Sequence, residues 1–250
     1  MTETESLPEE RVRFVGIRRK TAEKMLQSAR AIPHVSHFEE ADLTELEALR
    51  AELKDEAEKR GVKLSPLAFV CKALCASLAE FPSLNAVLDE EKQEIVHKKY
   101  YNLGIAVSAP QGLYVPVVKR AETKDLWAIA GEIASLAGKV RDNKVQLSDL
   151  QGGTFTVTNI GPIGGLFATP IILHPQTAIL GLMKMQPRPV VRDGAIVIRT
   201  MMNLALSFDH RVLDGAEAAR FAAGLVKRLE SPRVADFAAS TQAKITSIGG

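Results

Sequence analysis

The sequence predicts an α/β protein in which a two-layer sandwich is built around a mixed β-sheet. Helical and strand patterns alternate along the chain, but without the regular βαβ period that predicts an all-parallel sheet. Apolar residues make up 46% of the 250 residues, which is enough for a substantial core. The longest apolar run, near residues 164–173, is short and contains Pro170, so no transmembrane helix is predicted.

The first helix is predicted over residues 17–29, where Ile17, Thr21, Met25 and Ala29 recur every four positions. Ile32-Pro33 ends it, because proline disfavours helix for the residue before it. The pattern predicts further helices over residues 43–60, 65–78, 125–140 and 214–229.

Alternating or short apolar runs predict strands between these helices. The runs cover residues 34–41, 95–96, 103–107, 113–118, 154–158, 178–183 and 195–208. Asp193-Gly194 is a predicted turn just before the last of these strands. A glycine-rich loop over residues 161–165 follows the strand at 154–158.

Charge and composition narrow the classes of partner and compartment. The 32 basic and 30 acidic residues leave a net charge of +2, so neither nucleic acid nor a membrane is the expected partner. The acidic first ten residues do not resemble a signal or transit peptide, and we expect a cytoplasmic location. Cys71 and Cys75 lie four apart in an apolar run, which favours small core residues over a metal or redox site, and no metal is predicted.

The chain divides into one large unit and two short ends. Residues 1–12 are interpreted as a flexible tail or linker remnant, residues 13–238 as a single catalytic domain, and residues 239–250 as a C-terminal tail.

The segment that carries chemistry is Asp209-His210-Arg211-x-x-Asp214-Gly215. An apolar strand delivers His210 at its end, where a neutral imidazole can accept a proton near neutral pH. Asp214 with Glu217 makes an Asp-x-x-Glu capping pattern at a helix start. Asp214 therefore has two possible and compatible roles, as a helix cap and as a partner in an ion pair that orients the site.

This motif resembles the His-x-x-x-Asp-Gly signature shared by dihydrolipoamide acyltransferases and chloramphenicol acetyltransferases, and its wider form favours the former. Other segments resemble that family in order: Arg18-x-x-Thr21-Ala22-x-x-Met25, Gly112-Leu113-x-Val115-Pro116-Val117, residues 152–161, and Ala178-Ile179-Leu180-Gly181. The resemblance covers roughly residues 15–232 and implies a chloramphenicol-acetyltransferase-like fold. It also implies the acyltransferase core component of a 2-oxo acid dehydrogenase complex.

The resemblance implies a mechanism and a set of site residues. His210 would deprotonate the attacking thiol, Thr158 would donate a hydrogen bond to the oxyanion, and Asp214 would pair with Arg18 to orient the site. CoA and a lipoyl group carried on another chain or segment would be substrates. The site would form between subunits of a homotrimer, with His210 from one subunit and Thr158 from its neighbour.

The resemblance further implies an acyl pocket at Gly165, Ala168 and Met183, whose apolar character favours an uncharged acyl chain. Branched-chain acyl groups are favoured, with acetyl as the alternative. Expected partners are a lipoyl domain, the decarboxylase and dihydrolipoamide dehydrogenase, although no lipoyl or subunit-binding segment is recognised in the sequence. The rival interpretations are a chloramphenicol-type O-acetyltransferase and a non-catalytic scaffold core.

Overall fold

The computed structural model describes residues 8–233 and residue 237. Its centre is a six-stranded mixed sheet in the order β1-β10-β9-β8-β4-β7. The strands are β1 (His34–Asp42), β4 (Leu103–Ile105), β7 (Val117–Val118), β8 (Phe155–Asn159), β9 (Ala178–Arg192) and β10 (Ala195–Asp209). β8 pairs in parallel with β4 and β9, and the other neighbours are antiparallel. The predicted mixed-sheet α/β class is therefore confirmed.

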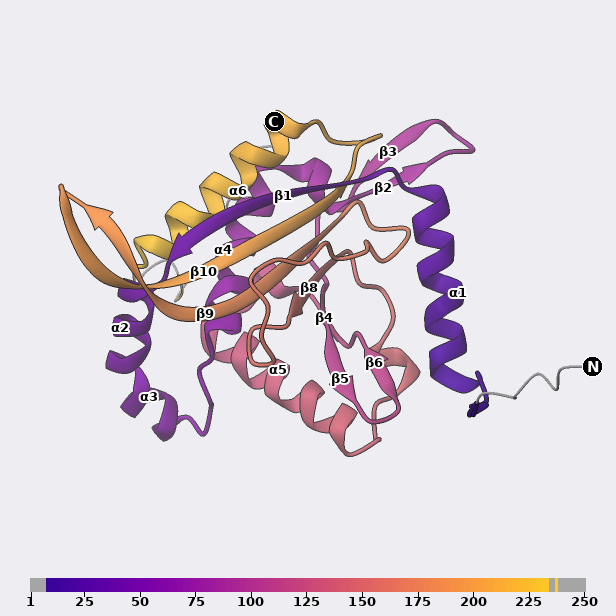
Figure 1. Cartoon of the computed structure of the whole chain (residues 1–250), viewed down its shortest axis with the longest axis horizontal. Helices are drawn as coiled ribbons and strands as arrows, with labels where there is room; N and C mark the ends of the chain where they lie inside the picture. The colour runs from indigo at the N-terminus through magenta and orange to yellow at the C-terminus, as the bar shows by residue number, and fades with distance from the viewer. Residues whose placement is uncertain (1–7, 234–236, 238–250) are drawn as a thin grey trace, which may run out of the picture.

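Helices cover one face of this sheet (Figure 1). They are α2 (Thr44–Glu52), α3 (Lys54–Lys59), α4 (Pro66–Glu80), α5 (Leu126–Arg141) and α6 (Gly215–Glu230). The core between the two layers includes Leu74 of α4, Ile129 of α5 and Phe221 of α6, packed with Phe155 and Leu206 of the sheet. These side chains are fully or almost fully buried, so the sandwich holds one continuous apolar core.

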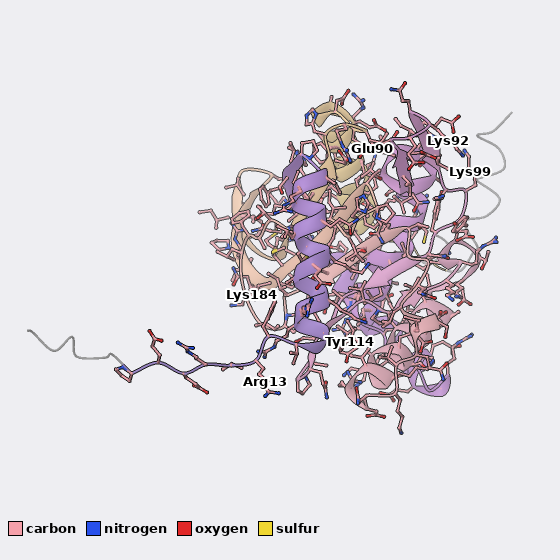
Figure 2. All side chains as sticks on the ribbon, turned by 90° about the vertical axis from the view of Figure 1, so that its right-hand side faces the viewer. Arg13, Glu90, Lys92, Lys99, Tyr114 and Lys184 are labelled. Carbon is pink, nitrogen blue, oxygen red and sulfur yellow. The ribbon has the colours of Figure 1, made fainter. Side chains whose placement is uncertain are left out.

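The helix α1 (Gly16–Ala31) stands apart from this layer, on the opposite side of the molecule from the tip of the β9–β10 hairpin (Figure 1). Figure 2 looks onto α1, with Tyr114 of β6 (Gly112–Tyr114) near its N-terminal end. Its outer surface leaves Leu26 exposed, as are Phe14 and Val15 just before it. An amphipathic helix with exposed apolar side chains is suited to contact a second protein surface.

The other face of the sheet is crossed by residues 160–177, which contain no helix or strand. Asn203 of β10 donates a hydrogen bond of 2.9 Å from Nδ2 to the Leu166 carbonyl, and Phe167 stacks edge-on against Phe38 of β1. Near its end, Ile172 packs with Ile32 and Ile179 in a small second apolar cluster. The segment is therefore fixed to the sheet at several points along its length.

Three predicted elements differ from the structure. The helix predicted over residues 43–60 is two helices, because the backbone turns at Leu53 (ψ of 1°). The strand predicted over residues 113–118 is interrupted at Pro116, which has no N–H for a ladder bond. The strand predicted over residues 103–107 changes partner after Ile105, where β5 (Val107–Ala109) begins a separate hairpin with β6.

One strand was missed and another was predicted too short. β2 (Ala86–Asp89) was not predicted and pairs with β3 (Glu94–His97), and β9 continues far beyond residue 183. The continuation carries Pro187, Pro189, Arg188 and Arg192, a composition that does not predict a strand in isolation. It is held as a ribbon by its antiparallel pairing with β10.

The cysteine prediction is confirmed. Cys71 and Cys75 lie buried in α4 as free thiols, and burial raises the pKa of Cys75 to about 12. Within the described residues, no cluster of His, Cys, Asp and Glu could hold a metal ion, and no helix could span a membrane. Of the predicted tails, residues 1–7 of the tail at 1–12 and all of residues 239–250 lie outside the described part of the chain.

Candidate active site

His210 lies directly after β10, where the chain turns toward α6. The backbone of this turn is held from two sides: Asp209 N donates to Thr177 O at 2.8 Å, and His210 N donates to Pro33 O at 3.2 Å. The His210 side chain is exposed, and among the described residues no hydrogen bond engages its ring. A fixed backbone with an open imidazole is suited to accept a proton from a bound molecule.

The two residues that flank His210 form an ion pair with each other. Asp209 is almost completely buried, and its carboxylate accepts hydrogen bonds from the Arg211 guanidinium at 2.7 and 3.0 Å. The bond to Asp209 raises the pKa of Arg211, so this cation stays charged. Arg211 also reaches Glu90 in the β2–β3 hairpin at 2.6 Å, near the hairpin tip seen in Figure 2. These contacts fix the turn on both sides of His210.

Asp214 caps α6. Its carboxylate accepts a hydrogen bond of 2.7 Å from Glu217 N, as the capping pattern predicts. Arg18 is exposed on the first turn of α1, and within the described residues of one chain no ion pair joins it to Asp214. The pairing of Arg18 with Asp214 therefore stays a prediction.

Thr158 lies near the end of β8, on the sheet face opposite the helices. Its neighbour Val157 points into the main core, and side chains alternate along a strand. Two other threonines of this region are engaged: Thr154 bonds to Asn102, and Thr156 donates to Gln176 at 2.7 Å. The half-buried Thr158 hydroxyl makes no hydrogen bond within the described residues, so it is available to a bound molecule.

One chain holds Thr158 and His210 far apart. Thr158 pairs with Gly181 of β9, and Gly181 pairs with Ala205 of β10, so Thr158 is level with Ala205. His210 follows Ala205 by five positions. At about 3.4 Å per residue along the strand and about 4.8 Å between strands, the two residues are roughly 20 Å apart. A single chain therefore does not bring them to one reacting group.

The three predicted pocket residues lie on the same sheet face as Thr158. Gly165 follows β8 in the left-handed backbone region (φ of 97°), and its carbonyl accepts a hydrogen bond of 3.0 Å from Lys184 N. Met183 is buried, and its terminal methyl lies where a side chain on Gly181 would be, 2.8 Å from an ideal Cβ. Because Gly181 pairs with Thr158 in the neighbouring strand, this methyl group lies close to the position of Thr158 on the sheet. Ala168 is half-buried in the crossing segment.

The sequence did not reveal one set of contacts at the site. The His34 ring bonds to Ile32 O at 2.9 Å and to Ile172 N at 3.0 Å, across 138 positions. Ser28 donates to Ile172 O at 2.5 Å. The only available signal was Pro33-His34 at the start of β1, and no pattern identifies residue 172 as its partner.

The sequence profile of the 2-oxoacid dehydrogenases acyltransferase (catalytic domain) family matches residues 6–235. The chain is 44% identical over 224 residues to the lipoamide acyltransferase component of the branched-chain alpha-keto acid dehydrogenase complex of Pseudomonas aeruginosa, covering 90% of this chain and 52% of that protein. It is 41% identical over 227 residues to the dihydrolipoyllysine-residue acetyltransferase component of the pyruvate dehydrogenase complex of Bacillus subtilis, covering 91% and 51%. The chain thus spans about half the length of these curated relatives.

Solved structures of acyltransferases are also similar to this chain. The dihydrolipoamide acetyltransferase of Azotobacter vinelandii superposes with a TM-score of 0.87 at 41% identity, covering 90% of this chain and 92% of that one. A chloramphenicol acetyltransferase superposes with a TM-score of 0.53 at 13% identity, covering 84% and 94%, which shows a shared fold alone.

Proposed function

The chain belongs to the 2-oxoacid dehydrogenase acyltransferase catalytic-domain family, and from this membership we propose that it transfers an acyl group between dihydrolipoamide and CoA. The lipoyl group and CoA are substrates in this proposal, and the lipoyl group is carried on a lipoyl domain. The family match supports this reaction over O-acetyl transfer, because the likeness to chloramphenicol acetyltransferase is one of fold alone.

His210 acts as the general base. Its open imidazole takes the proton from the attacking thiol, and the thiolate forms a C–S bond to the thioester carbonyl carbon. The carbonyl electrons move to oxygen, where the Thr158 hydroxyl donates a hydrogen bond. When the intermediate collapses, the original C–S bond breaks and the leaving thiolate takes the proton back from His210.

The offset between Thr158 and His210 is the observation that carries the assembly part of the proposal. One thioester is too small to reach both residues of one chain, so the site takes His210 from one subunit and Thr158 from its neighbour in a homotrimer. The segment that crosses the Thr158 face supports this arrangement, since Ile163 is 83% exposed and Phe167 is 63% exposed. Exposed apolar side chains on this scale are typical of a surface that another protein covers.

The acyl pocket is formed by Gly165, Ala168 and Met183 beside Thr158. These side chains offer no charge or hydrogen-bond donor to a carboxylate, so an uncharged acyl chain is favoured over a succinyl group. We propose a branched-chain acyl group, with acetyl as the alternative. Identities of 44% to a branched-chain relative and 41% to an acetyl-transferring one support both.

In this proposal the trimer acts with a decarboxylase, a lipoyl domain and dihydrolipoamide dehydrogenase, as the named complexes of its relatives suggest. A related structure is the cubic core of a pyruvate dehydrogenase multienzyme complex, which suggests assembly within a larger particle. The two free, buried cysteines suit the reducing cytoplasm.

The proposal is tested by measuring acyl transfer from acetyl-CoA and from isobutyryl-CoA to dihydrolipoamide, for the wild type and for His210→Ala. We expect wild-type turnover, a preference for isobutyryl-CoA, and a loss of about 10²–10⁴-fold in the variant. A faster rate with acetyl-CoA selects the acetyl alternative. An inactive wild-type trimer contradicts the enzymatic proposal and leaves a scaffold core.

A further inference from the structure

The backbone at His210 is supported by two segments that come from different parts of the chain. Pro33 O, just before β1, accepts the His210 N–H, and Thr177 O, at the end of the crossing segment, accepts the Asp209 N–H. The position of the imidazole therefore depends on how these two supports are held relative to each other.

The His34 side chain joins the two supports. His34 follows Pro33 directly, and its ring bonds to the backbone of Ile172, five positions before Thr177. Ile172 is completely buried, and its carbonyl oxygen accepts a hydrogen bond from the Ser28 hydroxyl of α1. The backbone N–H and C=O of this one buried residue are thus both bound by side chains from the α1–β1 region, which also supplies Pro33.

The contacts fix the tautomer of His34. A backbone N–H can only donate, so Nε2 accepts from Ile172 N and carries no proton. The proton is on Nδ1, which donates to Ile32 O. The ring is therefore neutral and acts as a rigid bridge between two backbone groups.

We infer that His34 is a positioning residue for His210, acting through the Ile172 backbone and the two carbonyls, of Pro33 and Thr177, that hold the β10–α6 turn. This inference rests on the proposed function, because its consequence is a rate of acyl transfer. A displacement of a catalytic group by about 1 Å can cost up to about 100-fold in rate, so a loosened support is expected to lower turnover.

Two substitutions at His34 separate its distant hydrogen bond, to Ile172 N, from its local one, to Ile32 O. In His34→Gln, the amide oxygen can occupy the place of Nε2 and still accept from Ile172 N. In His34→Asn, the amide nitrogen can occupy the place of Nδ1 and bond to Ile32 O, but nothing reaches residue 172. The inference predicts a kcat close to wild type for Gln and a fall of about tenfold or more for Asn.

The experiment measures kcat, both KM values, oligomeric state, unfolding temperature and amide hydrogen exchange at Ile172 and His210. We expect His34→Asn to lower kcat with little change in either KM, and to speed exchange at both amides, while His34→Gln keeps both protected. A wild-type rate in His34→Asn, or equal losses in both variants, overturns the inference.

Ser28→Ala is a second test that leaves His34 intact. It removes the hydrogen bond to the Ile172 carbonyl and is expected to lower kcat, with less than additive loss when combined with His34→Asn. If His34→Asn does not assemble, an unchanged kcat in Ser28→Ala overturns the inference. An inactive wild type contradicts the proposed function instead, and the exchange measurement then decides whether His34 still holds the His210 backbone.

Discussion

Within one chain, Thr158 and His210 are separated by two strand-to-strand spacings, with β9 lying between β8 and β10, and by five positions along the chain beyond Ala205 of β10. The separation follows from the strand register, in which Thr158, Gly181 and Ala205 are level. Register is fixed by the buried side chains on the helical face, since a shift of one residue would turn them outward. The distance is thus built into the fold, and the two residues can serve one reaction only if they come from different chains.

Thr158→Val tests the oxyanion contact. Valine has nearly the shape of threonine but no hydroxyl, so we expect kcat to fall about 10²–10³-fold with little change in folding. Thr158→Ser keeps the donor and is expected to retain most of the activity. The measurement is kcat for acyl transfer, and equal rates for the Val and Ser variants would remove Thr158 from the mechanism.

Asp214 caps α6 and is also proposed to pair with Arg18, and two variants separate these two roles. Asp214→Ala removes the acceptor for Glu217 N and is expected to lower the free energy of unfolding by about 1 kcal/mol. Asp214→Asn keeps the acceptor and should retain stability, but it removes the charge that would pair with Arg18. We expect a lower kcat in Asp214→Asn and in Arg18→Gln, measured beside urea unfolding. A full rate in both would leave Asp214 as a helix cap alone.

Asp42 makes the free energy of unfolding depend on pH in the acid range. Burial opposes ionisation of this carboxyl, but hydrogen bonds from Thr44, Arg199 and Arg192 outweigh it and lower the pKa to about 2. The resulting stabilisation, about 2 kcal/mol, is complete above the unfolded pKa near 4 and is lost as the pH falls through about 2.

We therefore expect Asp42→Asn to be less stable than the wild type at pH 7 and to approach it near pH 2. Urea unfolding at both pH values measures this, with the exposed Asp55→Asn as the matched control. An Asp42→Asn chain as stable as the wild type at pH 7 would contradict the assigned network.

The helices and the main sheet were predictable because their patterns are local. The apolar periods in α4 and α5, Pro66 at a helix start and the Asp125 cap all act within a few residues. The second half of β9, residues 184–192, was not predictable, because this arginine- and proline-containing segment is held by pairing with β10 rather than by its own composition. The break at Ala106 likewise depends on a change of partner strand.

At the site, His210, Asp214 and Thr158 could be selected from the sequence because a motif contains them. The bond between His34 and Ile172 could not, because it joins residues 138 positions apart in segments of unrelated pattern. The pairing of Arg18 with Asp214 is a prediction from the family resemblance, and no ion pair joins the two within the described residues of one chain.

The most direct test of the shared site mixes two inactive chains. His210→Ala and Thr158→Val chains carry different affinity tags, are co-expressed, and the mixed trimers are isolated through both tags. In a closed ring of three, one interface in each mixed trimer joins an intact His210 to an intact Thr158, so about a third of wild-type activity is expected. Mixed trimers of two differently tagged His210→Ala chains, as the control, should stay inactive. Mixed trimers no more active than either parent would contradict a site built from two subunits.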